Sequence, residues 1–381
     1  MSEVRKAPGG GGTFLRFVWQ QLTKRGASAF PSLPSYASIA PALRLLPGET
    51  VARVVELDLL ATDQGWRSSG VTVRKGQGFT LFADGAVWIA KALGVGAAPG
   101  TALWVRIGGR APIRKMAANA TSFEAWDDGE LELCLKPPGE WLDDSGRFDP
   151  DVTRSGATGK IAVTLALWPG DAAAGVAAFE RVTGLKGLVT QAEAAPSGWS
   201  YLWRIGDGSI YRPREEDGKS CIHVHTHGDV GILQYPIEAP LDDGAVLEWR
   251  WRVDRLPSSL PEHIQPTHDY LSIAVEYDNG QDLTYFWSTS LAVDTVFKCP
   301  LPWWATRETH WVVRSGTAGL GSWMTESRRL KPDYVQAIGG ALPAKIVRVW
   351  LIANSVFQRG HGEATFADIA LTSGGIRCQI A

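Results

Sequence analysis

Short runs of apolar and polar residues, broken by glycine-bearing turns, follow one another along most of the chain. In the first half they occupy residues 51–60, 71–90, 102–108, 129–135 and 160–168. Alternation with a period of two is typical of half-buried strands, and runs of this length and spacing predict antiparallel sandwiches. Helical spacing is confined to short segments such as 14–24 and 177–185. We therefore expect an all-β protein with two antiparallel, jelly-roll-like β-sandwiches.

Turn-rich stretches between these runs predict the domain boundaries. Residues 1–50 contain four consecutive glycines at 9–12 and are expected to form a flexible tail, a short helix and a wrapping loop. We expect the first sandwich over 51–170, a linker with a short helix over 171–198, and the second sandwich over 199–381.

The segment 221–228, C-I-H-V-H-T-H-G, holds three of the seven histidines. In a strand, His223, His225 and His227 share one face, and the apolar side chains between them share the other. We expect the apolar face in a core and the imidazole face toward solvent or a cleft. The imidazole face is the predicted functional surface.

A metal site is one interpretation of this strand. His223 and His227 are about 13 Å apart along a strand, too far to share a zinc ion with bonds of about 2.1 Å. At most two of the three histidines then bind one ion, and His268, Asp269 or Glu276 supplies a further ligand.

Metal-free acid–base chemistry is the second interpretation, because an imidazole beside a carboxylate exchanges protons near neutral pH. His225 would act with Asp269 or Glu276 as its orienting partner. Tyr270 and Glu276 would share the mixed small and polar face of the strand 270–277, like the floor of a cleft. A third interpretation is a set of surface histidines with no catalytic role.

Tryptophans, of which the chain has 17, supply buried area or flat stacking surfaces. In residues 247–253, L-E-W-R-W-R-V, the two tryptophans share a face with apolar residues and are expected in the core. Arg250 and Arg252 share the other face, where they would hold an anionic ligand group or form a charge ladder with Glu248. Trp303 and Trp304 lie in a proline-stiffened loop, where one could stack on a sugar ring or an aromatic ligand.

Composition excludes several functions. The formal net charge of −2 gives no electrostatic basis for binding nucleic acid or an anionic membrane surface. No apolar run approaches the roughly 20 residues that span a bilayer. Four scattered cysteines without an export signal predict a cytoplasmic location. No dinucleotide or phosphate-binding motif is present, so no organic cofactor is expected.

Residues 51–168 resemble the galactose-binding, calcium-dependent bacterial lectins. The resemblance is carried by Gly65-Trp66, by 76–85, by A-L-W-V-R-I-G at 102–108 and by P-G-E-W-L-D-D-S-G-R-F at 138–148. It implies a calcium site that binds sugar hydroxyls, with Asp143 and Asp144 as oxygen ligands. The acidic residue that precedes this motif in the family is replaced by Lys136, so the site either keeps calcium or is altered and metal-free.

Residues 199–372 resemble an uncharacterised bacterial family of β-sandwich domains of unknown function. The shared motifs are W-R-W-R-V at 249–253, D-Y at 269–270, L-G-S-W-M-T-E-S-R at 320–328 and A-D-I at 367–369. The resemblance implies a jelly roll and no particular chemistry. His268 and the histidine strand depart from the family's pattern, which suggests a remodelled pocket.

Three functions follow from these observations. The first is an enzyme of lyase, isomerase or hydrolase type, with a histidine-lined cleft in the second sandwich and a small apolar or glycosidic substrate. The second is a non-catalytic carbohydrate-binding protein. The third is a structural or interaction module. Zinc at the histidine strand and calcium at Asp143 and Asp144 are the metals considered.

Overall fold

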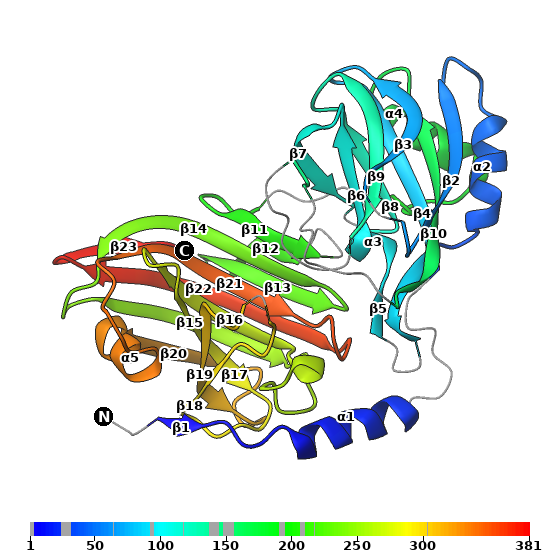
Figure 1. Cartoon of the computed structure of the whole chain (residues 1–381). Coiled ribbons are helices and arrows are strands. Elements are labelled where there is room, and N and C mark those ends of the chain that lie inside the picture. The colour runs from blue at the N-terminus through cyan, green and yellow to red at the C-terminus, as the bar shows by residue number, and fades with distance from the viewer. Residues whose placement is uncertain are drawn as a thin grey trace. The chain divides into compact units, whose positions relative to one another are not determined.

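The structure is a computed structural model in which the chain divides into two compact units (Figure 1). The small unit comprises residues 24–192 and 205–208, and the large unit comprises 1–23, 193–204 and 209–381. Described residues are 4–23, 32–63, 65–91, 95–116, 118–136, 145–147, 156–189, 195–205, 210–216, 218–302 and 304–381.

In the small unit, the described strands form two sheets. One sheet has the order β2 (Arg53–Leu60), β10 (Thr158–Leu167), β4 (Gly78–Ala90) and β5 (Val95–Ala97), with β8 (Ala120–Glu124) also paired to β4. The other has the order β3 (Arg67–Val73), β9 (Gly129–Leu135), β6 (Leu103–Ile107) and β7 (Arg110–Lys115), and a short helix, α3 (Pro99–Ala102), precedes β6. Alternate residues of β9 and β10, such as Leu131 and Val163, fill the core between them.

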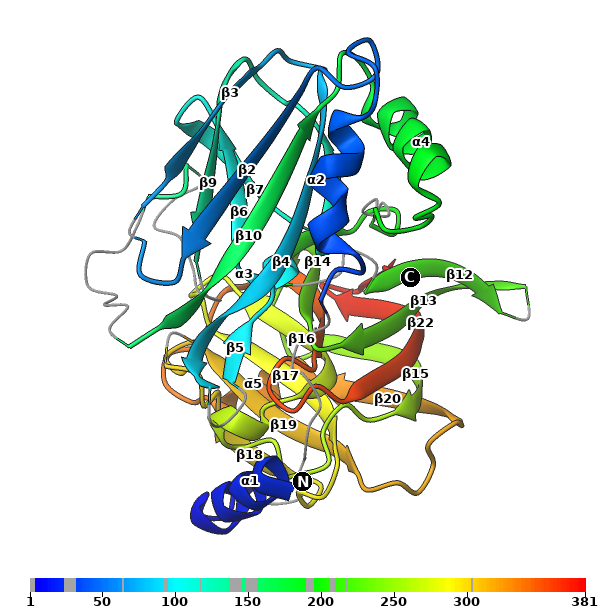
Figure 2. The ribbon, with the colours of Figure 1, turned by 90° about the vertical axis from the view of Figure 1, so that its right-hand side faces the viewer.

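Two helices cover the outer face of the sheet that contains β10 (Figure 2). They are α2 (Tyr36–Arg44) and α4 (Ala172–Thr183). Asp171 caps α4 by accepting a hydrogen bond from the Ala173 N–H, and Gly184 ends the helix with a φ of 73°. The helix expected in the linker at 171–198 therefore packs on the small unit.

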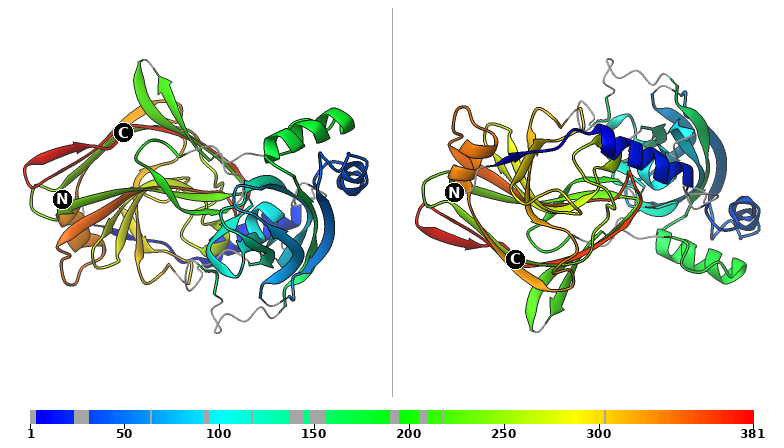
Figure 3. Two further views of the ribbon diagram at one scale, coloured as in Figure 1. Left: turned by 90° about the horizontal axis from the view of Figure 1, so that it is seen from above. Right: turned by 90° about the horizontal axis from the view of Figure 1, so that it is seen from below.

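The described strands of the large unit also form two sheets, which lie in layers (Figure 3). The first, here the eight-stranded sheet, has the order β1 (Arg5–Lys6), β18 (Thr295–Lys298), β19 (Glu308–Ser315), β17 (Asp282–Ser288), β16 (Tyr270–Tyr277), β21 (Lys345–Asn354), β14 (Val230–Pro240) and β11 (Ser200–Ile205). The second, here the six-stranded sheet, has the order β12 (Tyr211–Glu216), β13 (Lys219–His227), β22 (His361–Ser373), β15 (Val246–Arg255) and β20 (Trp323–Arg329), with β23 (Ile376–Gln379) paired to β22.

Alternation along β13 and β15 determines which side chains enter the core between these sheets. Trp249 and Trp251 of β15 are buried there, as expected. Ile222 and Val224 of β13 enter the same core. Their neighbours on each strand face outward because successive side chains of a strand point to opposite faces. The fold class is thus the expected one, all-β with two sandwiches.

Residues 1–50 are divided between the units, and part of the stretch expected to be a flexible tail is ordered as a strand and the start of a helix. The strand β1 pairs in parallel with β18 of the large unit and leads into α1 (Gly11–Thr23) (Figure 3). Phe17 of α1 is buried, and α1 lies against the short 3-10 helix η2 (Gln265–Thr267). Among the described helices, none is long and apolar enough to cross a membrane.

A crossover connection covers the outer face of the eight-stranded sheet. β17 and β19 run parallel, and a parallel pair requires a connection that passes over the sheet. The chain between them includes β18, which pairs with the far edge of β19, while Cys299, Leu301 and Trp304 pack in a second apolar cluster with Phe286 and Trp350. The face of β16 expected to line a cleft is consequently buried beneath this cover. The last helix, α5 (Leu330–Ala337), follows β20.

Candidate metal centre

Four side chains with metal-ligating atoms meet beneath the crossover. Glu308 and His310 alternate on β19, so both point to its outer face, whereas Trp311 points into the core. His268 lies between η2 and β16, and Cys299 directly follows β18. One ligand atom from each residue lies within 4.8 Å of the others. We call His268, Cys299, Glu308 and His310 the buried cluster.

Burial of this cluster is nearly complete. His268 and His310 are 0% exposed, Cys299 is 2% exposed and Glu308 is 3% exposed. The Cys299 Sγ lies 3.5 Å from the His268 Nε2. The His310 Nε2 lies 3.3 Å from the Glu308 Oε1. The four polar groups are therefore concentrated in an apolar surrounding, where each needs a partner.

The two imidazoles differ in how they are held. The His268 Nδ1 lies 2.6 Å from the backbone carbonyl oxygen of Glu262. Because a carbonyl only accepts, Nδ1 carries the proton and Nε2 presents a lone pair toward Cys299. In contrast, the Nε2 of His310 contacts the Glu308 carboxylate, and its Nδ1 has no hydrogen-bond partner. The ring of His310 is stacked on Phe297, with 5.1 Å between the ring centroids.

The pKa values of three members of the buried cluster are shifted by burial and by their neighbours. Burial and the neighbouring charge of His310 lower the pKa of His268 to about 3, which keeps its imidazole neutral. Burial acts to raise the pKa of Glu308, but contact with His310 outweighs it and lowers that pKa to about 2. Burial and the charge of Glu308 raise the pKa of Cys299, so its thiol is protonated in the absence of a metal.

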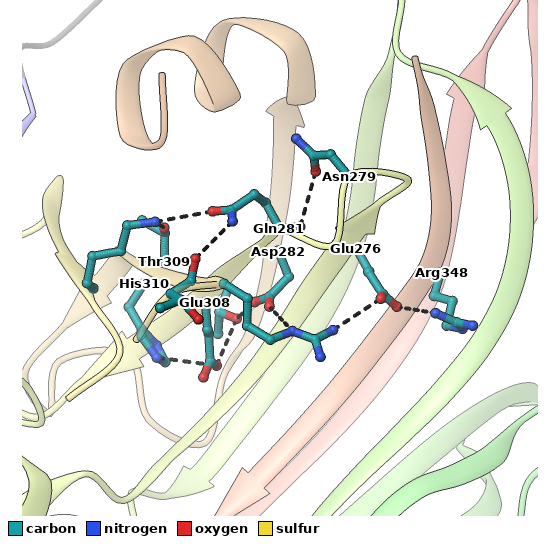
Figure 4. A network of polar contacts seen from close by, with 12 residues as sticks. Glu276, Asn279, Gln281, Asp282, Glu308, Thr309, His310 and Arg348 are labelled. Carbon is teal, nitrogen blue, oxygen red and sulfur yellow. Dashed lines mark hydrogen bonds and ion pairs between the residues drawn. The ribbon is translucent and has the colours of Figure 1, made fainter. Parts of the chain in front are cut away.

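A polar network extends from Glu308 across the sheet (Figure 4). The Thr284 hydroxyl lies 3.3 Å from a carboxylate oxygen of Glu308 and 3.3 Å from one of Asp282. Arg307 lies 3.9 Å from Asp282 and donates to Glu276 at 3.2 Å. Burial and the charge of Glu308 raise the pKa of Asp282. The guanidinium of Arg307 thus lies between two buried carboxyl groups.

The histidine strand lies in a different sheet from its expected partners. β13 pairs with β12 and β22 in the six-stranded sheet, whereas Glu276 lies on β16 of the eight-stranded sheet and Asp269 directly precedes it. Asp269 accepts the backbone N–H groups of Phe357 and Gln358. The expectation that a neighbouring strand brings Asp269 or Glu276 to His225 is therefore wrong, because β13 and β16 share no hydrogen-bonded edge.

The three histidines of β13 have separate surroundings. His223 is buried, with its Nε2 3.6 Å from the Glu363 Oε1, and burial and the charge of Arg214 lower its pKa. His225 and His227 are exposed. The ring of His227 stacks on that of His361, with 3.8 Å between centroids. Two of the three imidazoles thus face solvent.

His268 and Tyr270 are the sequence-predicted residues that the fold brings to the buried cluster. The Tyr270 hydroxyl donates to the Glu308 Oε1 at 3.1 Å. Sequence reasoning missed Cys299, Glu308 and His310. Glu308 and His310 are two residues apart on a strand and therefore share a face, as the histidines of β13 do. The same alternation could have identified them from the sequence.

Arg250 and Arg252, proposed to bind a ligand, both pair with carboxylates of the protein. Arg250 contacts Asp368 at 3.1 Å, and Arg252 contacts Glu216 at 2.7 Å. This pairing corresponds to the charge-ladder interpretation, although its acids are not Glu248. Trp304 is buried in the crossover, and Trp303 lies outside the described residues.

The predicted calcium ligands Asp143 and Asp144 also lie outside the described residues. Lys136, which replaces an acidic residue of the lectin motif, is 7% exposed.

Comparison with known proteins places part of the chain in an uncharacterised group. Residues 199–370 match the model of a family described as "Protein of unknown function (DUF3047)". No curated protein matches the chain. The C-terminal part is therefore similar to a family described only as of unknown function.

Comparison with solved structures gives several matches of low identity. A PllA-like lectin, the N-terminal domain of EclA, is 15% identical, and the match covers 30% of this chain and 95% of that one with a TM-score of 0.24. The xyloglucanase domain of NopAA from Sinorhizobium fredii is 9% identical over 47% of this chain and 94% of that one, with a TM-score of 0.29. A family 11 carbohydrate-binding module from Clostridium thermocellum is 11% identical over 48% and 92%, with a TM-score of 0.26.

Proposed function

We propose that the large unit is a metal-binding domain and that the buried cluster holds one zinc ion. The observation that carries this proposal is the convergence of four buried ligand atoms, one each from His268, Cys299, Glu308 and His310, with the Nδ1 of His310 left without a hydrogen-bond partner. An unsatisfied buried polar group costs about 1–3 kcal/mol, which a bond to a metal would remove. Three other ligand atoms lie within 4.8 Å of the His310 nitrogen.

The donor set selects the metal. Zinc is bound by thiolate sulfur, imidazole nitrogen and carboxylate oxygen, and this cluster offers all three kinds. Calcium and magnesium prefer oxygen ligands alone, of which the cluster has only those of Glu308. The backbone carbonyl that fixes His268 is the kind of outer partner that orients metal-bound imidazoles.

The number of ligands and their burial favour a structural role. Structural zinc sites are closed by four protein ligands, whereas catalytic sites keep a position open for water or substrate. With its four ligands nearly inaccessible to solvent, the buried cluster fits the closed type. The ion would fix the crossover, through Cys299, to β19 and to the segment before β16. An enzyme acting through His225, and carbohydrate binding by the small unit, remain predictions from sequence.

Elemental analysis of protein purified from zinc-supplemented medium tests the proposal. We expect one zinc per chain in the wild type, and substoichiometric zinc in Cys299→Ser and His310→Gln. Cys378→Ser, which alters a partly exposed thiol on β23, is the matched control and should keep its zinc. Wild-type protein without stoichiometric transition metal would contradict the proposal.

A spectroscopic measurement on the wild type avoids dependence on variants that fold poorly. Cobalt substituted for zinc should give the intense near-ultraviolet absorption of thiolate bound to cobalt, because a metal deprotonates its cysteine ligand. If cobalt binds without that absorption, Cys299 is not a ligand and the assigned cluster is incorrect.

A further inference from the structure

Exposed side chains gather on the outer face of the six-stranded sheet. His225 and His227 of β13 alternate with core residues and face solvent. β22 pairs with β13 so that His361 is opposite His227, and Glu363 is opposite His225. We call these four residues the surface cluster. Its members occupy the corners of one small rectangle of the sheet.

The dimensions of this rectangle suit a chelating site. Directly opposed residues of an antiparallel pair have Cβ atoms about 4.5–5.5 Å apart, and residues two apart along a strand are about 6.6–7 Å apart. The ring centroids of His225 and His361, on one diagonal, are 5.8 Å apart. Three imidazoles and a carboxylate can therefore converge above the sheet by rotation of exposed side chains alone.

Metal binding would require the histidine rings of the surface cluster to rotate from their present arrangement. The rings of His227 and His361 are stacked with an interplanar angle of 2°. A ring nitrogen binds a metal in the plane of its ring, so parallel stacked rings do not direct their lone pairs at one ion. Rotation about the side-chain torsions is open to both residues because both are exposed.

The backbone beneath the cluster is rigidly held, which lowers the entropic cost of forming a site. β13 pairs with β22 through all four residues, the His225 N–H donates to the Ile210 carbonyl oxygen, and Glu363 is opposite Arg255 of β15. On the same face of the sheet, the Nε2 of the buried His223 lies 3.6 Å from the Glu363 carboxylate.

We propose that His225, His227, His361 and Glu363 form a second, surface site for a divalent transition-metal ion. It is separate from the buried cluster, because the two clusters project from the outer faces of different sheets. Imidazole ligands suit copper, nickel and zinc, and affinity rises toward copper in the usual order of these ions. With three nitrogen donors and one carboxylate, the surface cluster takes these ions in preference to calcium or magnesium.

Calorimetric titration with Ni²⁺ tests this site without oxidising the thiols. The protein is first passed over a chelating resin that removes surface-bound metal, and its remaining zinc content is measured. We expect one Ni²⁺ per chain to bind the wild type. The double variant His225→Gln/His361→Gln should lose at least about 10–100-fold in affinity, the range that even outer-shell changes cause at metal sites.

Cross-controls distinguish this inference from the proposed zinc site. Cys299→Ser should lose buried zinc and bind Ni²⁺ as tightly as the wild type does. His225→Gln/His361→Gln should retain its zinc, and because both residues are exposed it should fold normally by circular dichroism. Absence of saturable Ni²⁺ binding to the wild type, or equal affinity in the double variant, would overturn the surface site whatever the zinc content.

Discussion

The buried carboxyl of Glu262 should make the protein less stable as the pH rises. Its side chain is 1% exposed. One carboxylate oxygen accepts the Ser288 hydroxyl at 2.6 Å, and the other accepts the Thr289 N–H at 2.6 Å. Burial outweighs these hydrogen bonds and raises the pKa of Glu262 from 4.5 to about 7. The folded protein therefore favours the protonated acid.

The sign and size of the effect follow from linkage. Because the folded-state pKa is the higher one, the stabilisation is fully present below pH 4.5 and is lost as the pH rises through 7. A shift of about 2.5 pKa units corresponds to about 3 kcal/mol at 1.36 kcal/mol per unit. Between pH 5 and pH 8 this group should cost the folded state about 2–3 kcal/mol.

Glu262→Gln isolates this contribution. The amide reproduces the protonated acid, since its oxygen can accept from Thr289 and its nitrogen can donate to Ser288. The backbone carbonyl that contacts His268 is unchanged by the substitution. Urea unfolding of both proteins at pH 5, 6, 7 and 8, at constant ionic strength, gives the difference in unfolding free energy at each pH. We expect the variant to become relatively more stable by about 2–3 kcal/mol from pH 5 to pH 8.

Glu215→Gln serves as the control, because Glu215 is an exposed glutamate on β12. Its pH profile should run parallel to that of the wild type. A parallel profile for Glu262→Gln as well, or a wild type that gains stability relative to that variant at high pH, would refute the reasoning that burial dominates at Glu262.

Three further changes have expected outcomes. Trp251→Ala removes a fully buried ring and should lower the free energy of unfolding by about 3–5 kcal/mol in urea; an unchanged midpoint would contradict its place in the core. Arg307→Met removes one of two arginines that contact Glu276 and should cost about 1.5–3 kcal/mol, against little change for the exposed Arg255→Met. Zinc removal by a chelator should lower the thermal midpoint of the wild type and leave that of Cys299→Ser unaltered, as scanning calorimetry would show.

The alternation of residues by itself determined which side chains share a face of each strand and which face enters the core. In β15 it placed Trp249 and Trp251 in the core, and in β13 it left His225 and His227 facing outward. The period of two is a local property of extended backbone, so it can be read from a few neighbouring residues. The same local signal, together with turn spacing, predicted two β-sandwiches.

Only the tertiary structure decided which strands are neighbours. His225 and Glu276 were matched by their chemistry, but pairing placed them in different sheets. Strand pairing depends on contacts between residues far apart in the sequence, and alternation contains no information about them. The partners of His225 on β22 are more than 130 residues away in the sequence, and they follow from that pairing alone.

The buried cluster shows the same division between what the local pattern determines and what strand pairing determines. The sequence indicates that Glu308 and His310 share a face, because they alternate on one strand. It does not indicate that the face is covered, since the cover arises from the parallel pairing of β17 with β19 and the crossover this pairing requires. That connection also forms β18, which places Cys299 beside Glu308 of β19, and His268 is fully buried. The local pattern thus determined the direction of each side chain, and the long-range topology determined its neighbours and its burial.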